Sequence, residues 1–228
     1  TIKDLARHGW TATYLPVGSS GVVNPSDLEA AITEQTALVS VMHANNEIGT
    51  LQPITELAAI AHSQGALFHT DAVQTAGKYP IRASELGVDL LSISGHKFNG
   101  PKGVGALWIK RGTRLASSLT GGRQERNRRA GTENVAGIAG FGVAAQVASD
   151  KLNMETSRLG RMRDHLESEI LSNVTGTNVN GNGQRVSNTT NISFEGIEAE
   201  ALLIALDLDG IAVSTGSACS SGTLEPSH

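Results

Sequence analysis

The sequence predicts an α/β domain with a mostly parallel sheet flanked by helices, followed by a smaller α+β unit. Short apolar runs, which are typical of buried strands, alternate with helical patterns through the first half of the chain. After about residue 150 this alternation gives way to a charged helix, a Gly- and Asn-rich stretch and a few short elements. We therefore expect a large domain over residues 1–149 and a small domain over residues 150–228.

The first elements follow from local signals. Residues 11–17 predict a strand, followed by a Gly/Ser loop. A short helix is expected to begin in residues 24–29, with Ser26 as its cap and Glu29 completing a capping box. Residues 37–43 predict a strand that runs into the polar turn 44–49.

The middle of the chain carries the clearest patterns. Residues 54–64 predict a helix, because their apolar side chains recur at helical spacing and Gly65 follows them. Residues 66–72 predict the next strand, and residues 88–93 and 104–109 predict two more. Parallel sheets bind ligands at the carboxyl ends of their strands, where His43, Asp71 and Lys97 each fall.

The last third of the chain predicts fewer and shorter elements. A helix of small residues is expected over 132–149, and a charged helix over 151–171 either continues it or starts anew. Residues 175–187 indicate loops with at most one short strand. The remaining elements are a strand at 189–194, a helix at 198–208, a strand at 211–214 and a final loop around Cys219.

Composition narrows the classes of protein. With 228 residues, 39% of them hydrophobic and 18% charged, the chain can bury one large core. A net charge of −4 gives no reason to expect a nucleic acid or an anionic membrane as partner. No long apolar run and no signal pattern is present, so we expect a soluble, cytoplasmic protein. One local basic cluster is interpreted as a solvated loop: Arg123, Arg126, Arg128 and Arg129.

The chain has one cysteine, which excludes an internal disulfide framework and a cysteine-based zinc site. A lone cysteine is most often a small buried hydrophobe. Cys219, however, lies among small polar residues in 217–222 (SACSSG), a sequence that would expose it. The chain also starts at Thr1 without Met and stops at His228 without a closing element, which predicts a piece of something longer.

The linker between two predicted strands, residues 92–103 (SISGHKFNGPKG), concentrates reactive groups. It holds hydroxyls, an imidazole and Lys97, among glycines that allow tight turns and close approach. A lysine at a strand end loses its proton readily when desolvated and can then form a Schiff base. A lone lysine there would be a surface residue in a hairpin, but its surroundings favour the reactive interpretation.

If Lys97 holds an aldehyde cofactor such as pyridoxal 5′-phosphate (PLP), the ring nitrogen needs an acidic partner. Asp71 fits that role, although an aspartate after a strand also commonly caps a turn. Gln74 could bond the ring hydroxyl, and His43 could stack on the ring and move protons; each signal is weak alone. The candidates for the phosphate are Ser94, His96 and Thr132.

Taken in order, five motifs resemble those of the cysteine desulfurases, PLP enzymes of the class V aminotransferase superfamily. They are residues 43–49 (HANNEIG), 69–74 (HTDAVQ), 92–97 (SISGHK), 122–134 (GRQERNRRAGTEN) and 217–222 (SACSSG). The resemblance covers nearly the whole chain. The cysteine segment, with residues 224–228 (LEPSH) after it, is similar to the group that supplies sulfur to iron–sulfur cluster assembly and nitrogenase maturation.

This resemblance implies a PLP-dependent transferase of fold type I that converts L-cysteine to L-alanine as a homodimer. Lys97 would form the Schiff base and move the Cα proton. Cys219 would attack the substrate sulfur as thiolate, become a persulfide and pass the sulfur to an acceptor or scaffold protein, with His43 as proton acceptor. Asn46 would lie near the ring oxygen and the substrate. The remaining implied roles are the ring nitrogen for Asp71, the ring oxygen for Gln74, ring stacking for His43, the phosphate for Ser94 and His96, and the partner subunit's phosphate for Thr132.

Two family features are absent from these residues. The Gly/Thr phosphate loop would lie before Thr1, and the arginine that grips the substrate carboxylate would lie beyond His228. Three alternatives stay open: a selenocysteine lyase, an aminotransferase of the same superfamily, and a catalytically incompetent scaffold. The exposed thiol of Cys219 argues against an aminotransferase, which has no use for it.

Overall fold

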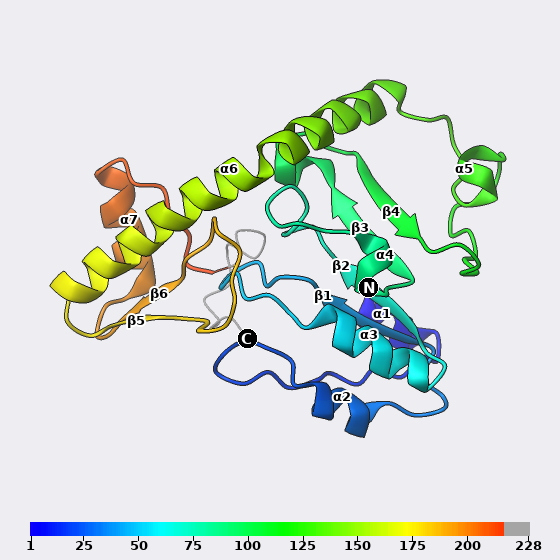
Figure 1. Cartoon of the computed structure of the whole chain (residues 1–228), viewed down its shortest axis with the longest axis horizontal. Coiled ribbons are helices and arrows are strands. Elements are labelled where there is room, and N and C mark those ends of the chain that lie inside the picture. The colour runs from blue at the N-terminus through cyan, green and yellow to red at the C-terminus, as the bar shows by residue number, and fades with distance from the viewer. Residues whose placement is uncertain (217–228) are drawn as a thin grey trace.

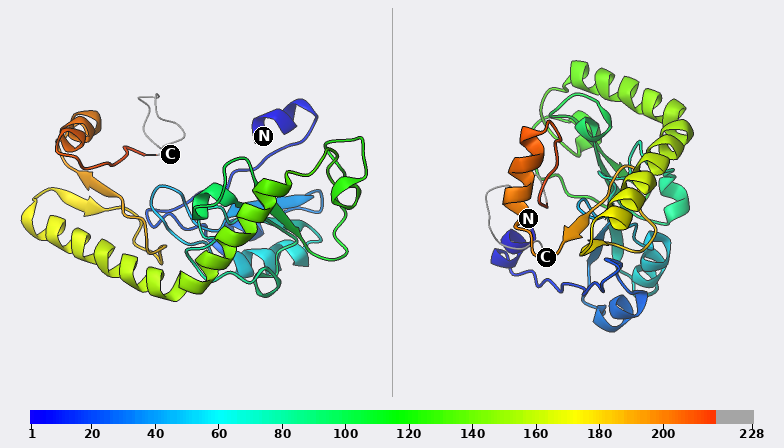
Figure 2. Two further views of the ribbon diagram at one scale, coloured as in Figure 1. Left: turned by 90° about the horizontal axis from the view of Figure 1, so that it is seen from above. Right: turned by 90° about the vertical axis from the view of Figure 1, so that its left-hand side faces the viewer.

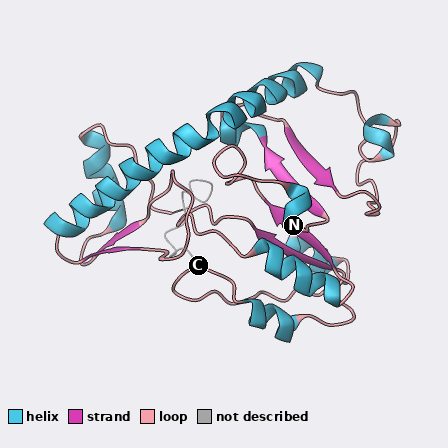
Figure 3. Ribbon diagram, viewed as in Figure 1, coloured by secondary structure: helices cyan, strands magenta, loops and turns pink. Residues whose placement is uncertain are grey.

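A computed structural model describes residues 1–216 of the chain (Figures 1 and 3). Within these residues, helices and strands alternate up to β4, and a long helix then leads to a smaller unit. The elements in chain order are α1 (Ile2–Arg7), α2 (Pro25–Ala31), β1 (Leu38–Met42), α3 (Ile54–Ser63), β2 (Leu67–Asp71), α4 (Ala83–Leu86), β3 (Leu90–Ser94), the 3₁₀ turn η1 (Gly95–Phe98), β4 (Gly105–Ile109), α5 (Gln124–Asn127), α6 (Val135–Asn173), β5 (Thr177–Val179), β6 (Ile192–Phe194) and α7 (Ala199–Leu208).

The main sheet has four strands in the order β1-β2-β3-β4. The first three are parallel, and β4 pairs antiparallel with β3 at the edge. The prediction of a mostly parallel sheet flanked by helices is therefore confirmed. In register, Asp71 lies between Met42 of β1 and Ser92 of β3, so the carboxyl ends of three strands meet at one edge of the sheet.

Helix α3 covers one face of this sheet. Its buried side chains Ile54, Leu57 and Ala61 pack with Phe68 of β2 and Leu91 of β3 in the hydrophobic core. Burying a side chain such as Phe68 stabilises the fold by about 1.5–3 kcal/mol. The apolar residues whose spacing predicted a helix over 54–64 are thus the residues that pack on the sheet. Gly65 follows the helix in a left-handed conformation, with φ 78°.

The opposite face of the sheet carries no helix among the described residues, and we call it the open face. Apolar side chains from three strands are exposed there: Leu38, Met42, Leu67 and Leu107. Strand β1 and the turn after it line a broad groove whose other walls include the N-terminal segment, β6 and α7. In the left view of Figure 2, the β5–β6 unit lies to the left of the main sheet and α1 lies above the sheet.

Helix α6 is one continuous helix of 39 residues, so the two helices expected over 132–149 and 151–171 are a single element. Its first half contacts η1, and its second half contacts β5. The side chain of Asn134 caps its start by accepting from Gly137 N at 3.0 Å. The boundary expected near Ser149 falls inside this helix, and the division into domains 1–149 and 150–228 stays a prediction.

The smaller unit is tied to the main domain through backbone hydrogen bonds. Leu51 N donates to Gln184 O at 2.7 Å, and Val186 N donates to Gly49 O at 2.9 Å. A buried ion pair within the smaller unit holds the same segment: the guanidinium of Arg185 binds both carboxylate oxygens of Glu167 on α6, at 2.7 and 2.8 Å. We call this pair the α6 clamp. It fixes the segment that supports the turn after β1.

Three local predictions are wrong. Residues 11–17 form no strand beyond a single bridge between Val17 and Val23, because no neighbouring strand in the described chain pairs with them. Residues 211–214 likewise remain irregular, and Ile211 and Val213 are about half exposed. Helix α2 is capped by Asn24, whose side chain accepts from Ser26 N at 3.1 Å, so the capping box that was expected to start at Ser26 does not form.

Candidate active site

The ends of β1, β2 and β3 bring together residues that are far apart in the sequence. His43 follows β1, Asp71 ends β2 and Ser94 ends β3. The backbone N–H of His43 donates to the carbonyl oxygen of Asp71 at 2.8 Å, which joins the first two ends directly. The expectation that the ends carrying His43, Asp71 and Lys97 lie side by side is confirmed.

Lys97 lies in η1, a single tight turn immediately after β3. Gly100 N donates to Gly95 O at 2.8 Å, and Asn99 takes a left-handed conformation, with φ 65°, that reverses the chain. Within this turn the hydroxyl of Ser94 and Nδ1 of His96 form a hydrogen bond of 2.8 Å. The turn therefore presents a lysine, a hydroxyl and an imidazole together at the strand end.

Close packing against α6 fixes the turn that holds Lys97. The rings of Phe98 and Phe141 meet edge to face, with centroids 5.2 Å apart. Two glycines allow this approach. A Cβ atom on Gly95 would lie 2.9 Å from the Phe141 ring, and one on Gly140 would lie 2.6 Å from Cγ of Pro101. The position of Lys97 thus depends on small residues at the contact.

We expect Gly140→Ala to destabilise the native protein by about 1–3 kcal/mol, because the new methyl group overlaps the ring of Pro101. Gly160→Ala is the matched control on the same helix, since its Cβ would meet only Ser187 Cβ, at 3.9 Å. That substitution should be neutral or stabilising by up to about 1 kcal/mol, the helix-propensity difference. Urea unfolding of both variants measures the difference, and equal stabilities would contradict the packing argument.

Asp71 is oriented by its own backbone, since its Oδ1 accepts a hydrogen bond from Val73 N at 2.9 Å. No hydrogen bond to the other carboxylate oxygen is found within residues 1–216, so that oxygen could accept one from a ligand. Gln74 lies in the turn that follows, and Lys78 lies near the end of that turn. Burial lowers the pKa of Lys78, and the neighbouring charge of Lys97 lowers it further. The two ammonium groups are therefore close enough to influence each other.

His43 is almost fully buried, with 4% of its surface exposed. The hydroxyl of Thr75 forms a 3.0 Å hydrogen bond with its Nδ1, and its ring meets Tyr79 edge to face at 5.7 Å. Burial lowers the pKa of His43, so the ring is neutral at neutral pH. The contacts with Thr75 and Tyr79 hold His43 in the interior at the ends of β1 and β2. Ring stacking and proton transfer by His43 stay predictions.

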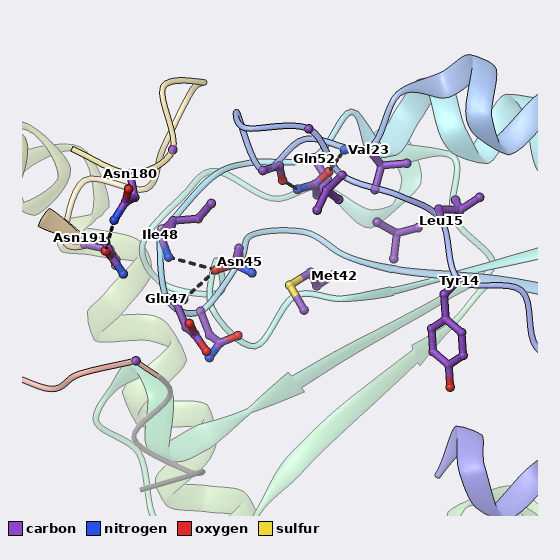
Figure 4. A pocket seen from close by; sticks show the side chains of 18 of the residues that line it. Tyr14, Leu15, Val23, Met42, Asn45, Glu47, Ile48, Gln52, Asn180 and Asn191 are labelled. Atoms are coloured by element: carbon purple, nitrogen blue, oxygen red, sulfur yellow. Dashed lines mark hydrogen bonds between the residues drawn. The ribbon is translucent and has the colours of Figure 1, made fainter. Parts of the chain in front are cut away.

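The turn after β1 is held by the side chain of Asn45. Its Oδ1 accepts from Glu47 N at 2.8 Å and from Ile48 N at 3.0 Å (Figure 4). Asn46, the predicted ligand of the ring oxygen, lies exposed on this turn. Asn180 and Asn191 of the smaller unit, joined by a 2.8 Å hydrogen bond, lie on the far side of Ile48 in the same view.

Two predicted site residues are not part of this cluster. Thr132 is exposed in the segment between α5 and α6, which lies at the outer edge of the molecule in Figure 1, away from the ends of β1–β3. Cys219 lies outside the described residues. Among the described residues, no group of three or more metal-binding side chains is found, and no helix is long and apolar enough to cross a membrane.

Comparison with known proteins identifies the family. The family model described as aminotransferase class-V matches residues 1–228. The chain belongs to the class-V aminotransferases. A curated relative, the cysteine desulfurase IscS of Dictyoglomus turgidum, is 52% identical over 98% of this chain. The chain spans 57% of the length of that relative.

Solved structures of similar proteins share this fold. The NifS-like protein of Rickettsia africae superposes with a TM-score of 0.84 at 38% identity, over 89% of this chain and 57% of its own. A structure titled "SspA in complex with cysteine" superposes with a TM-score of 0.77 at 32% identity, over 96% of this chain and 60% of its own. The expected fold, a PLP-dependent transferase of fold type I, is confirmed.

The cofactor of this class-V aminotransferase is PLP, and the residues at the strand ends fit it chemically. A protonated ring nitrogen needs a carboxylate, which Asp71 could supply in a fixed orientation. A phosphate needs hydrogen-bond donors, which the bonded Ser94 and His96 could supply. An aldehyde needs an amine, which Lys97 could supply from the same turn. The family confirms the predicted cofactor, and the role of each residue stays a prediction.

Sequence reasoning missed residues that act behind this site. Thr75 fixes His43, and the amide of Gln52 binds both Val23 N and Gly21 O, which ties the N-terminal segment to the end of the turn after β1. His69 bonds serines on both neighbouring strands. The spacing of His69 to Asp71 was a usable signal, because residues i and i+2 of a strand share a face.

Proposed function

We propose that the protein is a PLP-dependent cysteine desulfurase, which converts L-cysteine to L-alanine and holds the sulfur as a persulfide on Cys219. The observation that carries the proposal is the placement of Asp71 and Lys97 at adjacent strand ends, in a chain whose one cysteine lies in the segment 217–222. Relatives about half identical to this chain are named cysteine desulfurases. The structure of SspA with cysteine supports L-cysteine as substrate.

When bound, PLP supplies an electron sink that stabilises negative charge at the substrate Cα. Lys97 is proposed to take the Cα proton at Nζ and to return a proton later in the cycle. The residues proposed to hold PLP are Asp71 at the ring nitrogen, Gln74 and Asn46 at the ring oxygen, His43 as a candidate for the ring face, and Ser94 and His96 at the phosphate.

The sulfur step is proposed to use Cys219 as thiolate, the reactive form of a cysteine. A bond forms between Sγ of Cys219 and the substrate sulfur, and the bond between that sulfur and Cβ breaks. The electron pair of the broken bond stays with the carbon, which takes up a proton and becomes alanine. The two sulfurs are oxidised to the persulfide level as the substrate carbon is reduced, so no outside oxidant is needed.

A homodimer is the assembly that we propose. The first half of α6 exposes a series of apolar side chains, which a second copy could cover. Thr132 lies at the base of this helix and away from the strand ends of its own chain, so we propose that it reaches the phosphate in the partner subunit. The exposed side chains of this series are Val135, Ile138, Val143 and Val147.

The acceptor and the compartment are also proposals. A persulfide on Cys219 must be passed on, and a scaffold protein of iron–sulfur assembly is the acceptor class that we propose. The cytoplasm is the proposed compartment, because its reducing conditions keep a thiol of this kind free.

Cys219→Ser is expected to abolish persulfide formation and alanine release when the purified native protein is given L-cysteine. Serine cannot accept the sulfur, whereas the visible absorbance of bound PLP should remain. Ser220→Ala, the neighbouring substitution in the sequence, serves as the control and should retain activity. Mass spectrometry of the peptide that contains residue 219 measures the added sulfur. A serine variant that still forms a protein persulfide from L-cysteine would overturn the proposal.

A further inference from the structure

A chain of hydrogen bonds crosses three strands of the main sheet through one histidine. Nδ1 of His69 on β2 lies 2.8 Å from the hydroxyl of Ser40 on β1, and its Nε2 lies 2.9 Å from the hydroxyl of Ser92 on β3. Both ring nitrogens are therefore engaged. The motifs that contain His69 and Ser92 pointed to the cofactor site, yet neither residue has a place in the mechanism described above.

This chain lies on the open face, beside Asp71. Residues i and i+2 of a strand share a face, so His69 and Asp71 are neighbours along β2. Ser92 is also the residue that pairs with Asp71 in the register between β2 and β3. Exposed apolar side chains lie on the same face, including Met42 and Leu67. Side-chain packing does not require the hydrogen-bonded row of Ser40, His69 and Ser92 on this face, so another role is expected for these residues.

The two serines fix the ring and can satisfy both of its nitrogens in the neutral form. A neutral imidazole has one N–H donor and one bare nitrogen, and a hydroxyl can accept from the first or donate to the second. Burial lowers the pKa of His69, while the charge of Asp71 raises it. An uncharged ring next to Asp71 leaves the negative charge of that carboxylate available for a cation.

We propose that His69 is a positioning residue for Asp71, held between Ser40 and Ser92 so that a neutral, oriented ring supports the carboxylate that binds the protonated ring nitrogen of PLP. The proposal rests on the proposed function for the cofactor role of Asp71. The proposal adds a set of residues that act on the cofactor through Asp71: His69 on β2 and its two serine partners on β1 and β3.

The test compares variants of the native protein that differ in this row. His69→Leu fills a similar space on an already apolar face but removes both hydrogen bonds, and His69→Gln keeps a polar group that can reach one serine. Ser40→Ala and Ser92→Ala remove one partner each. Ser63→Ala is the control, since its hydroxyl is exposed and bonds only Ile60 O, at 2.8 Å.

Two measurements separate positioning from simple packing. The dissociation constant of PLP is measured by titrating PLP-free protein, and the nitrogen shifts of His69 are followed by ¹⁵N NMR in the same PLP-free samples. We expect PLP to bind about fivefold to tenfold more weakly to His69→Leu, with partial recovery in His69→Gln. Each serine variant should shift the ring-nitrogen signals of His69, and Ser63→Ala should change neither quantity.

Unchanged PLP affinity in His69→Leu would overturn this inference alone, because the unmodified protein would still bind the cofactor. An unmodified native protein that does not bind PLP would overturn the proposed function as well. If the ¹⁵N shifts of His69 are the same in Ser40→Ala, Ser92→Ala and the unmodified protein, the hydrogen bonds of His69 to the two serines do not exist in solution. That result would also overturn the inference.

Discussion

Replacing Lys97 by alanine is expected to lower the turnover of L-cysteine by roughly 10²–10⁴-fold, the range found for loss of a positioned acid–base group. We expect this loss because, among the described residues, Lys97 is the one lysine in the turn η1. That turn directly follows β3, the strand that pairs with β2 at Asp71. Alanine also removes the amine to which PLP attaches. Because Phe98 and the α6 contact remain, the fold should be retained, with little change in melting temperature.

Two measurements check this expectation. Borohydride reduction followed by mass spectrometry should find PLP attached to the peptide containing residue 97 in the unmodified protein and unattached in Lys97→Ala. Lys102→Ala is the control, since Lys102 is exposed further along the same turn and loop. If Lys102→Ala lost covalent attachment while Lys97→Ala kept it, the assignment of the reactive lysine would be wrong.

Arg185→Leu is expected to destabilise the native protein by about 3–5 kcal/mol. The substitution leaves the carboxylate of Glu167 buried without its cation, since the Glu167 side chain is 11% exposed and bonded bidentately by Arg185. Removing both members, as in the Glu167→Leu/Arg185→Leu variant, should cost much less, because no buried charge remains. Urea unfolding measures both losses.

The control for the α6 clamp lies on the same helix. Arg158 and Glu155 form an ion pair of 2.6 Å, but both side chains are substantially exposed. Arg158→Ala should therefore cost less than about 1 kcal/mol. Equal losses for Arg158→Ala and Arg185→Leu would show that burial of the clamp does not determine its contribution.

The clamp also predicts a dependence of stability on pH. The hydrogen bond from Arg185 holds the pKa of Glu167 below its ordinary value, so the folded state binds the proton of this group less readily than the unfolded state. Its contribution is present above the pKa of the unfolded chain and is lost as the pH falls through the lower folded pKa. This acid-side loss should be absent in the Glu167→Leu/Arg185→Leu variant.

Much of the main sheet was predictable because its signals are local. Apolar runs predict the buried strands, and apolar residues at helical spacing predict the face of α3 that packs on the sheet. Both patterns can be recognised in a short stretch of sequence, without knowledge of distant residues. The positions of Asp71 and Lys97 could be predicted because parallel sheets bind their ligands at the carboxyl ends of the strands. Both residues lie where that rule places them.

The failures arise where the outcome depends on a partner. Residues 11–17 and 211–214 have suitable strand composition, but a strand needs a neighbour, which propensity cannot report. The contacts of His43 with Thr75 and Tyr79 could not be foreseen, because they depend on how the next turn folds back. The row through His69 was missed because its three members come from three strands.

The continuity of α6 has a mechanical consequence. The helix contains no proline and joins the turn of Lys97 at one end to the clamp at the other, so it behaves as a stiff strut rather than as a linker. A hinge at Ser149 would have to break hydrogen bonds in the middle of the helix. Bending the helix at that point is therefore costly, because it would remove helical hydrogen bonds between the two units.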